Sequence, residues 1–470
     1  MTNDKLREEC AIFGTVTKSG EAAGITYNAL LAMQHRGQEG AGIAVLNGNT
    51  ISCQKEVGLV SEVFTGKVLS NFPESNFGIG HDRYSTTGKN TRENVQPFVT
   101  EFLKGRIATA HNGNIVNGYE IKEKLKSYGC DFSASSDSEV ISSLIAYRAL
   151  NGGNVEEAVI SACRQISGAF SLVILSSEGK LIGVRDGYGF RPLCLGKNQY
   201  GYALASESCG LDSSGYEFVR DIDPGEMIVI DESGIVSNQI ILETDKKGLC
   251  VFEYVYFSRP DSVIDNLSVY EARYNMGKIL ADEHPVDADM VCGVPDSGLE
   301  AAMGYSAGSS LPLVSGFVKN RYIGRSFIFP SQKQRDAAVK MKLNPLSANV
   351  KGKRIILVDD SIVRGTTSAK IISSMRNAGA KEVHMLISSP PFRHTCHFGT
   401  DIDSEENLIA NQMTIEQIRQ KIGADSLGFI SADGLIKACE KSRCALCTGC
   451  FTGDYPIDIG NHTKSQLEEE

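Results

Sequence analysis

Cys10 is a candidate nucleophile near the start of the chain, in the run ECAIFG at residues 9–14. A thiolate can attack an amide carbon if a base takes the thiol proton and nearby donors stabilise the oxyanion. Removal of the first nine residues would give Cys10 a free α-amine, whose ordinary pKa of about 8 suits that base. A cysteine before an apolar strand can equally be a packing residue. Cys10 alone therefore leaves both roles open.

Four polar segments after Cys10 carry further groups that could serve amide chemistry. They are QHRGQEGAG at 34–42, HDRYST at 81–86, HNGN at 111–114 and SDSE at 136–139. Together with Cys10 they resemble the class II glutamine amidotransferases, whose glutaminase domain has an N-terminal nucleophile. The resemblance implies that Asn112 and Gly113 form the oxyanion hole. It also implies that Arg83 binds the α-carboxylate of glutamine and Asp137 its α-ammonium group.

Three residues differ from the usual pattern of that family. Ala11 stands where the family usually has glycine, and Asp82 and Thr87 stand where it usually has valine and alanine. Every residue to which the resemblance gives a chemical role is present. We therefore expect glutaminase chemistry at Cys10, with residues 1–9 as a propeptide.

A second set of chemical groups lies in the run IILVDDSIVRGTTS at residues 355–368, where a strand ends in two acids before a short loop and a helix. Backbone N–H groups of residues 365–368, with the helix dipole, suit a phosphate monoester. The carboxylates of Asp359 and Asp360 can accept hydrogen bonds from ribose hydroxyls. The run lacks the Gly-Lys-Ser/Thr of a Walker loop. The alternative is a capped helix with the two acids as turn residues.

This run closely resembles the phosphoribosyl diphosphate (PRPP) motif of type I phosphoribosyltransferases. The resemblance implies that Asp359 and Asp360 bind the ribose hydroxyls, and that Mg²⁺ binds the pyrophosphate and ribose oxygens. The residues that it implies around the 5′-phosphate are Arg364, Gly365, Thr366 and Thr367.

A second turn, VPDSG at residues 294–298, also follows a predicted strand and begins a helix, so it is suited to an anion. In the same resemblance Asp296 and Ser297 are PRPP ligands, and Ser297 joins Asp359 and Asp360 as a candidate Mg²⁺ ligand. Two basic segments, KNRYIGR at 319–325 and QKQR at 332–335, lie between these turns in an otherwise acidic chain. We interpret them as a lid over pyrophosphate that excludes water, with a solvated surface loop as the alternative.

Cys444, Cys447 and Cys450 form a C-x₂-C-x₂-C run near the C terminus. Three thiolates this close together indicate a metal centre, and an iron–sulfur cluster accepts further, scattered ligands. Zinc is the alternative, although zinc ribbons normally supply a second C-x₂-C pair, which this sequence lacks. The isolated residues Cys250 and Cys396 would complete the site.

These features, with the run EYVYFSRPDS at residues 253–262, together resemble the glutamine phosphoribosylpyrophosphate amidotransferases in their iron–sulfur, propeptide-bearing (Bacillus-type) form. The resemblance implies transfer of ammonia from glutamine to C1 of PRPP, the first step of purine synthesis. It also implies a homotetramer and feedback inhibition by purine nucleotides. It assigns a structural [4Fe–4S] cluster to Cys250, Cys396, Cys447 and Cys450, with the choice between Cys444 and Cys447 left open.

Two other functions remain alternatives. One is a different class II amidotransferase, acting on a sugar phosphate or on aspartate, which would not need the Asp-Asp…Gly-Thr-Thr run. The other is a regulator that binds PRPP without catalysis, which would leave the glutaminase residues without a use.

The composition is that of an ordinary globular protein, with 470 residues, 41% apolar and 22% charged. The net charge of −10 argues against binding nucleic acid through bulk electrostatics. No apolar run approaches the roughly 18 residues of a membrane helix, and the N terminus does not resemble a secretory signal. We expect a cytoplasmic enzyme whose partners are small molecules.

The strands and helices that must position these groups follow two different patterns along the chain. Residues 10–245 are expected to form an α+β layered domain, with strands at 169–175, 179–184, 202–205 and 227–230 and helices at 138–150 and 155–166 that begin at the caps Asp137 and Asn154. Residues 246–470 alternate instead, with strands at 289–294, 354–358 and 382–388 and helices at 299–307 and 367–378. The pattern predicts an α+β domain followed by an α/β domain with a parallel sheet, and the resemblances imply that these are an αββα N-terminal-nucleophile domain and a type I phosphoribosyltransferase domain. Ligands of its parallel sheet bind at the carboxyl ends of the strands.

Overall fold

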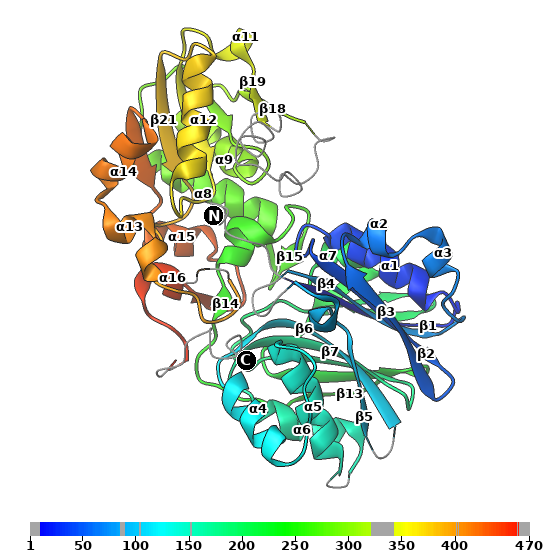
Figure 1. Cartoon of the computed structure of the whole chain (residues 1–470). Coiled ribbons are helices and arrows are strands. Elements are labelled where there is room, and N and C mark those ends of the chain that lie inside the picture. The colour runs from blue at the N-terminus through cyan, green and yellow to red at the C-terminus, as the bar shows by residue number, and fades with distance from the viewer. Residues whose placement is uncertain are drawn as a thin grey trace.

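The computed structural model describes residues 10–84, 90–102, 105–150, 153–320, 343–400, 402, 404–457 and 459. The predicted propeptide and most of the predicted lid, at 321–342, lie outside the described residues. The described chain forms two halves side by side, an N-terminal half with two large sheets and a C-terminal half around a parallel sheet (Figure 1).

The first sheet of the N-terminal half has seven antiparallel strands in the order β11-β9-β10-β1-β4-β2-β3. Its central strand β1 (Ala11–Thr17) is wholly buried, with Ala11 facing helix α1 (Ala22–Met33) and Ile12 facing the second sheet. Because successive side chains of a strand point to opposite faces, this one strand contributes to two cores. The other strands are β2 (Gly40–Asn47), β3 (Thr50–Val57), β4 (Phe77–Arg83), β9 (Cys194–Asn198), β10 (Gly201–Ala205) and β11 (Glu217–Asp221).

The second sheet has six antiparallel strands in the order β13-β12-β8-β7-β6-β5, and apolar side chains fill the space between it and the first sheet. Helices α4 (Gly118–Ser127), α5 (Asp137–Leu150) and α6 (Val155–Cys163) cover its outer face. The layers are therefore helix, sheet, sheet, helix, which confirms the αββα prediction. The strands are β5 (Phe98–Phe102), β6 (Gly105–Ile115), β7 (Gly168–Ser176), β8 (Lys180–Arg185), β12 (Glu226–Asp231) and β13 (Gly234–Ile240).

The C-terminal half is built on a parallel sheet of order β17-β20-β21-β22. Its strands are apolar on both faces, as parallel strands between helices must be. One face packs on α8, α9 and α15, and the other on α12 and α14. This confirms the predicted α/β domain. The elements are β17 (Met290–Gly293), β20 (Arg354–Asp359), β21 (Glu382–Ile387), β22 (Ser426–Phe429), α8 (Val269–Glu283), α9 (Leu299–Ser309), α12 (Thr366–Asn377), α14 (Ile415–Ile422) and α15 (Ala432–Ala438).

Between the halves lie the π-helical turn η2 (Glu253–Phe257) and the parallel pair β14 (Leu249–Cys250) and β23 (Leu446–Cys447). The ring of Phe190, from the N-terminal half, stacks on Phe398 with centroids 4.3 Å apart. One apolar core therefore continues across the junction. The remaining elements are α2 (Val60–Val63), α3 (Gly66–Leu69), η1 (Arg92–Asn94), α7 (Ser208–Ser213), β15 (Val263–Ile264), β16 (Leu267–Ser268), β18 (Phe317–Lys319), β19 (Leu343–Pro345), α11 (Ser347–Val350), η4 (Glu405–Asn407), α13 (Ile409–Gln412) and α16 (Gly449–Thr452).

Every strand and helix predicted from the sequence is present, and the ends differ by at most three residues. One predicted cap is wrong. Asp137 is the first residue of α5 rather than its N-cap, and the hydroxyl of Ser136 accepts the Ser138 N–H instead (3.3 Å). Asn154 caps α6 as predicted, because its side chain accepts the Glu157 N–H (2.9 Å).

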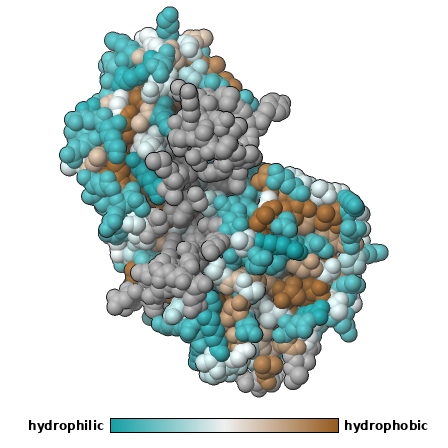
Figure 2. Space-filling view, in the orientation of Figure 1, coloured by the Kyte–Doolittle hydropathy of each residue, from teal (hydrophilic) through white to brown (hydrophobic). Residues whose placement is uncertain are grey.

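In the described part of the chain, no helix is both long and apolar enough to cross a bilayer. The face seen in Figure 2 is largely hydrophilic, with hydrophobic patches over the N-terminal half. Several exposed apolar side chains of that half lie on the sheet-edge strands β11 and β13, among them Phe218, Val219, Ile235 and Val236.

Candidate active sites

Cys10 lies at the start of β1, and its side chain is almost fully buried. Its thiol donates to the carbonyl oxygen of Tyr84 (3.6 Å), which follows β4. Its own carbonyl oxygen accepts a hydrogen bond from Nε of Arg36 (3.1 Å). The adjacent strands β1 and β4 therefore place Cys10 beside the end of β4, where Arg83 also lies.

The two predicted glutamine ligands converge on this place. Burial lowers the pKa of Arg83, and electrostatic interactions with Cys10, Glu39 and Asp137 oppose that shift. The strand register supplies the geometry: Ala11 of β1 lies opposite Asp82 of β4, so Cys10 and Arg83 are neighbours at the end of that pairing. Asp137 comes from a different element, the first turn of α5, where its carboxylate accepts the Ile115 N–H (3.1 Å). Arg83 and Asp137 are both buried, so the predicted glutamine ligands lie in an enclosed site.

Asn112 and Gly113 lie within β6, the strand that pairs with β7. The side-chain Nδ2 of Asn112 is buried and has no hydrogen-bond partner among the described residues. Gly113 has φ +143°, and an added Cβ would stand 2.1 Å from the carbonyl oxygen of Ala169. A buried donor without a partner is costly in a folded protein, so Asn112 has the property expected of an oxyanion-hole donor.

The two histidines of this region, His81 and His111, are buried. Burial lowers the pKa of both, well below the ordinary value in the case of His81. His81 Nε2 lies 3.2 Å from the His111 carbonyl oxygen, and His111 Nδ1 lies 3.1 Å from Ser138 Oγ and 3.8 Å from Asp137 Oδ1. Burial thus favours the neutral form of both rings, and these contacts do not include the Cys10 thiol.

Sequence reasoning gave no role to a set of buried charges next to Cys10. Arg36, Glu207 and Glu253 are fully buried and joined by hydrogen bonds of 2.7–2.9 Å. Arg36 lies in the polar run at residues 34–42, and Glu253 begins the run at residues 253–262. Their contact joins residues 217 positions apart, which no local pattern indicates.

The predicted PRPP ligands come together at the carboxyl ends of β17 and β20. These strands are parallel neighbours, with Gly293 opposite Val358, so the turns that follow them are adjacent. Ser297 Oγ donates to Asp360 Oδ1 (2.5 Å) across the two turns. Asp359 and Asp360 are both buried. Two carboxylates and a hydroxyl are the oxygen ligands that Mg²⁺ prefers, so these residues fit a magnesium site.

The predicted phosphate loop ends at the N terminus of α12. Gly365 is the N-cap residue with φ +82°, a left-handed conformation that glycine adopts freely, and it has no side chain with which to cap the helix. The first turn carries Thr366 and Thr367. The helix N terminus is therefore suited to a phosphate group.

Asp296 is arranged differently from the buried acids. Its side chain is 69% exposed and pairs with Lys319 on β18. Strands β18 and β19 form an antiparallel pair on either side of residues 321–342, where most of the predicted lid lies outside the described residues. The structure places Asp296 at the rim of the site rather than among its buried ligands.

The four predicted cluster cysteines come from three distant segments and contribute to the same apolar core. Cys250 and Cys447 lie opposite each other in the parallel pair β14 and β23. Burial raises the pKa of Cys450, and interactions with Cys396, Cys250 and Cys447 raise it further. Cys444 has a different environment, since its electrostatic partners are Arg185, Asp265 and Arg443. Cys447 is therefore the residue of the C-x₂-C-x₂-C run that lies opposite Cys250.

Two metal hypotheses apply to these thiols, an iron–sulfur cluster and a zinc ion. Among the described residues, no three His, Cys, Asp or Glu side chains have the spacing that one metal ion requires. A multi-iron cluster occupies the space between its ligands, so its cysteine sulfurs stand farther apart than those around one zinc ion.

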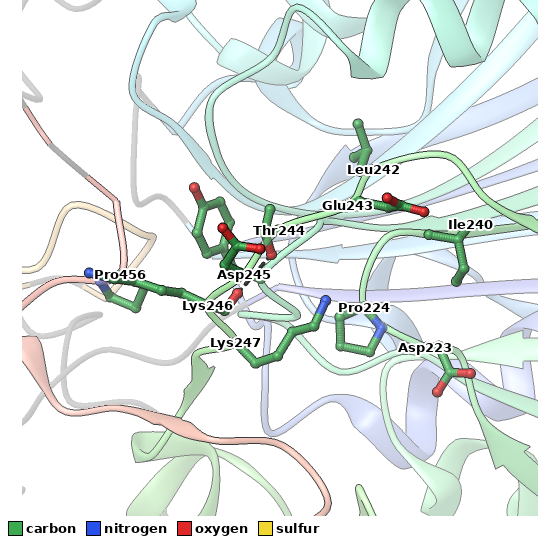
Figure 3. A pocket seen from close by; sticks show the side chains of 11 residues that line it. Asp223, Pro224, Ile240, Leu242, Glu243, Thr244, Asp245, Lys246, Lys247 and Pro456 are labelled. Carbon is green, nitrogen blue, oxygen red and sulfur yellow. Dashed lines mark hydrogen bonds between the residues drawn. The ribbon is translucent and has the colours of Figure 1, made fainter.

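A surface groove of about 970 Å³ is lined mainly by residues near the end of the N-terminal half (Figure 3). Lys247 Nζ donates to the carbonyl oxygen of Gly187 (3.1 Å), and the lining includes both acidic and basic side chains. No predicted catalytic residue lines this groove. The lining residues are Tyr188, Asp223, Pro224, Ile240, Leu242, Glu243, Thr244, Asp245, Lys246, Lys247 and Pro456.

Family models match both halves of the chain. A glutamine amidotransferase domain matches residues 81–213, and a phosphoribosyl transferase domain matches residues 266–389.

Full-length relatives are also similar. An amidophosphoribosyltransferase of Synechocystis sp. is 48% identical over 99% of this chain and 95% of its own length. Those of Methanocaldococcus jannaschii and Bacillus subtilis are 45% and 44% identical, over 96% and 97% of this chain and 98% and 96% of their own lengths. The solved structure of the glutamine PRPP amidotransferase from B. subtilis, complexed with ADP and GMP, is 43% identical and has a TM-score of 0.89. That match covers 97% of this chain and 99% of the other.

Proposed function

The chain belongs to the amidophosphoribosyltransferase family, and we propose how its two sites share that reaction. The enzyme converts glutamine, PRPP and water to 5-phosphoribosylamine, glutamate and pyrophosphate, the first step of purine synthesis. The observation that carries the proposal is that Cys10 lies beside Arg83 at the end of the β1–β4 pairing, in the same chain as the joined turns of Ser297 and Asp360.

In the N-terminal half, Cys10 is the nucleophile. After loss of residues 1–9, its α-amine takes the thiol proton and the thiolate attacks the amide carbon of glutamine. Asn112 Nδ2 and the Gly113 N–H stabilise the oxyanion. Ammonia leaves with the amine's proton, and water hydrolyses the thioester to glutamate.

Two charged side chains orient glutamine for that attack. The guanidinium of Arg83 binds the α-carboxylate, and the carboxylate of Asp137 binds the α-ammonium group. The two side chains come from different elements, β4 and α5, and together they would bind both charged groups on the α-carbon of glutamine. A substrate without either group would lose orientation at the amide carbon.

In the C-terminal half, ammonia attacks C1 of PRPP and the bond from C1 to pyrophosphate breaks. Asp359 and Asp360 hold the ribose hydroxyls, and residues 364–367 hold the 5′-phosphate at the start of α12. Asp296 and Ser297 lie on the pyrophosphate side. Ser297, Asp359 and Asp360 would hold Mg²⁺, which neutralises charge on the departing pyrophosphate.

Four cysteines, Cys250, Cys396, Cys447 and Cys450, hold a [4Fe–4S] cluster in this proposal. The reaction transfers no electrons, so the cluster would fasten three distant segments of the C-terminal half together. We place the enzyme in the cytoplasm, where thiols stay reduced.

Ammonia must pass between the sites without being protonated, so the glutaminase should be slow until PRPP is bound. Purine nucleotides are the expected inhibitors, since the similar enzyme of B. subtilis was solved with ADP and GMP. A homotetramer is the expected assembly, and the exposed apolar residues on β11 and β13 are surfaces that it could cover.

The test is release of glutamate and pyrophosphate from anaerobically purified protein, with and without PRPP and Mg²⁺. Equal, PRPP-dependent release of both products supports the proposal. Glutamate without pyrophosphate would indicate a different acceptor and another class II amidotransferase. Binding of PRPP without either product would favour the non-catalytic regulator.

A further inference from the structure

Four fully buried charged side chains lie between the two halves next to Cys10. They are Arg36 and Arg191, which are positive, and Glu207 and Glu253, which are negative. The charges balance, and each is less than 2% exposed. Buried charges are costly unless paired in good geometry, so a network of this kind points to a positional requirement.

Arg36 is the centre of the network. Its Nη1 donates to Glu207 Oε1 (2.7 Å) and Glu253 Oε2 (2.8 Å), and its Nη2 donates to Glu253 Oε1 (2.9 Å). These bonds leave Nε directed at the carbonyl oxygen of Cys10 (3.1 Å). Because a guanidinium is planar, Glu253 fixes the direction of the Nε–H bond.

That bond matters because of where Cys10 lies in the mature chain. Without residues 1–9, Cys10 has no preceding peptide bond to restrain it, and strand pairing begins only at Ala11. The carbonyl is then the backbone group that can orient the residue. A small rotation of Cys10 would move both the thiol and the α-amine away from glutamine.

We propose that Glu253, supplied by the turn η2 at the start of the C-terminal half, is a positioning residue of the glutaminase site and acts on Cys10 through Arg36. The inference rests on the proposed role of Cys10 as the nucleophile. Ser258, which follows η2, supports the same carboxylate by donating to Glu253 Oε2 (2.7 Å).

The same carboxylate reaches the cysteine segment. Arg191 Nη1 lies 3.4 Å from Glu253 Oε1, and its Nη2 donates to the carbonyl oxygen of Phe398 (2.6 Å). Phe398 follows Cys396 by two residues, and its N–H donates to the Cys396 sulfur (3.4 Å). The position of Glu253, and hence of Cys10, is thereby tied to both halves.

The experiment measures two reaction rates of the full-length protein after removal of residues 1–9. One is glutamate release with PRPP and Mg²⁺; the other is pyrophosphate release with ammonium salt in place of glutamine, which bypasses Cys10. For Glu253→Gln we expect kcat of the first rate to fall by about 10- to 100-fold, with the second within about twofold of wild type. Arg36→Gln should act in the same way, and the double variant should lose no more than either single variant.

A matched control is available in the pair Arg185–Asp265, which is equally buried and also joins the two halves (2.7 Å) but does not contact Cys10. Asp265→Asn should change both rates by the same factor. If Glu253→Gln does not fold, Ser258→Ala is the milder variant, with an expected threefold to tenfold loss, about the value of one hydrogen bond, in glutamate release alone.

Two results would overturn the inference. One is an equal ratio of the two rates in Glu253→Gln and Asp265→Asn. The other is a double variant whose losses multiply, because Glu253 would then not act through Arg36. Failure of the proposed function looks different, since glutamate release would survive Cys10→Ala.

Discussion

The two candidate sites of this chain are built in opposite ways. The groups around Cys10 come from paired strands and a helix start, and their side chains are buried, with Asp137 only 6% exposed. The PRPP groups come from the turns after β17 and β20, where Asp296 is 69% exposed. One site is enclosed by sheet register, and the other is open at its rim.

The difference follows from what each site must do. A cysteine nucleophile needs a fixed base and a fixed oxyanion donor in a place of low dielectric constant, where each hydrogen bond counts for more. A site for a highly charged phosphate ester must admit and release its ligand, so rim charges and loop N–H groups suit it better. The chain therefore separates rigid amide chemistry from exchange of a charged substrate.

The largest expected effect removes the enclosed site alone. Cys10→Ala should abolish glutamate release, by about 10⁴-fold or more, because no other group can form the thioester. Pyrophosphate release driven by ammonium salt should persist, since it uses only the open site. The measurement is both product assays on one preparation. Loss of both activities in folded protein would contradict the division into two sites.

Removing the unpartnered side-chain donor of Asn112 should slow glutamate release without abolishing it. Asn112→Ala should lower kcat for glutamate release by about 10²- to 10³-fold and leave KM nearly unchanged, because the oxyanion forms only in the transition state. Steady-state kinetics with glutamine checks this. The control is Asn117→Ala, which removes structural bonds to Ser167 and Gln165 beside α4 and should leave kcat intact.

The open site should respond differently. Asp360→Asn should lower pyrophosphate release by about 10- to 100-fold with glutamine and with ammonium salt alike, since a charge-assisted bond to PRPP or Mg²⁺ is lost. The control is Asp289→Asn, at the opposite end of the same strands, where the carboxylate pairs with Arg354 (3.0 Å). If only the glutamine-driven rate fell, Asp360 would belong to the coupling between sites rather than to PRPP binding.

Sequence patterns predicted what local chemistry determines. The strand of β20 is a continuous apolar run that ends in two acids, so its burial and the position of Asp359 could both be predicted. The short strand β22 (Ser426–Phe429) was missed, because four residues of mixed polarity carry no clear period. Asp137 was expected to cap α5, but its carboxylate is used by the Ile115 N–H of another element.

Contacts between distant segments were beyond the sequence patterns. The C-x₂-C-x₂-C run does not itself distinguish Cys444 from Cys447 as a ligand, and only the pairing of β14 with β23 places Cys447 opposite Cys250. The bond from Arg36 to Glu253 likewise joins residues 217 positions apart. The cluster, the magnesium site and the catalytic roles stay predictions until the product assays and metal analysis are done.

One residue of the enclosed site is buried in an unfavourable way. Asp82, on β4, points to the same side as Gly78 and Gly80, whose neighbours are side chains of α1. Both carboxyl oxygens are buried and have no hydrogen-bond partner among the described residues. Burial raises the pKa of Asp82 well above its ordinary value of 3.8.

The smallest expected effect concerns stability: replacing Asp82 should make the protein more stable. Asp82→Val should raise the free energy of unfolding near pH 4 by about 1–3 kcal/mol, the cost of burying an unpaired polar group. The gain should grow as pH rises towards the raised native pKa, because only the unfolded carboxyl ionises there. Denaturant unfolding at several pH values measures this. Asp186→Val is the control and should destabilise, since Asp186 accepts N–H groups of Tyr188 and Gly189 (2.9 and 2.8 Å). If Asp82→Val were less stable than wild type at every pH, the prediction that the Asp82 carboxyl is buried at a cost would be wrong.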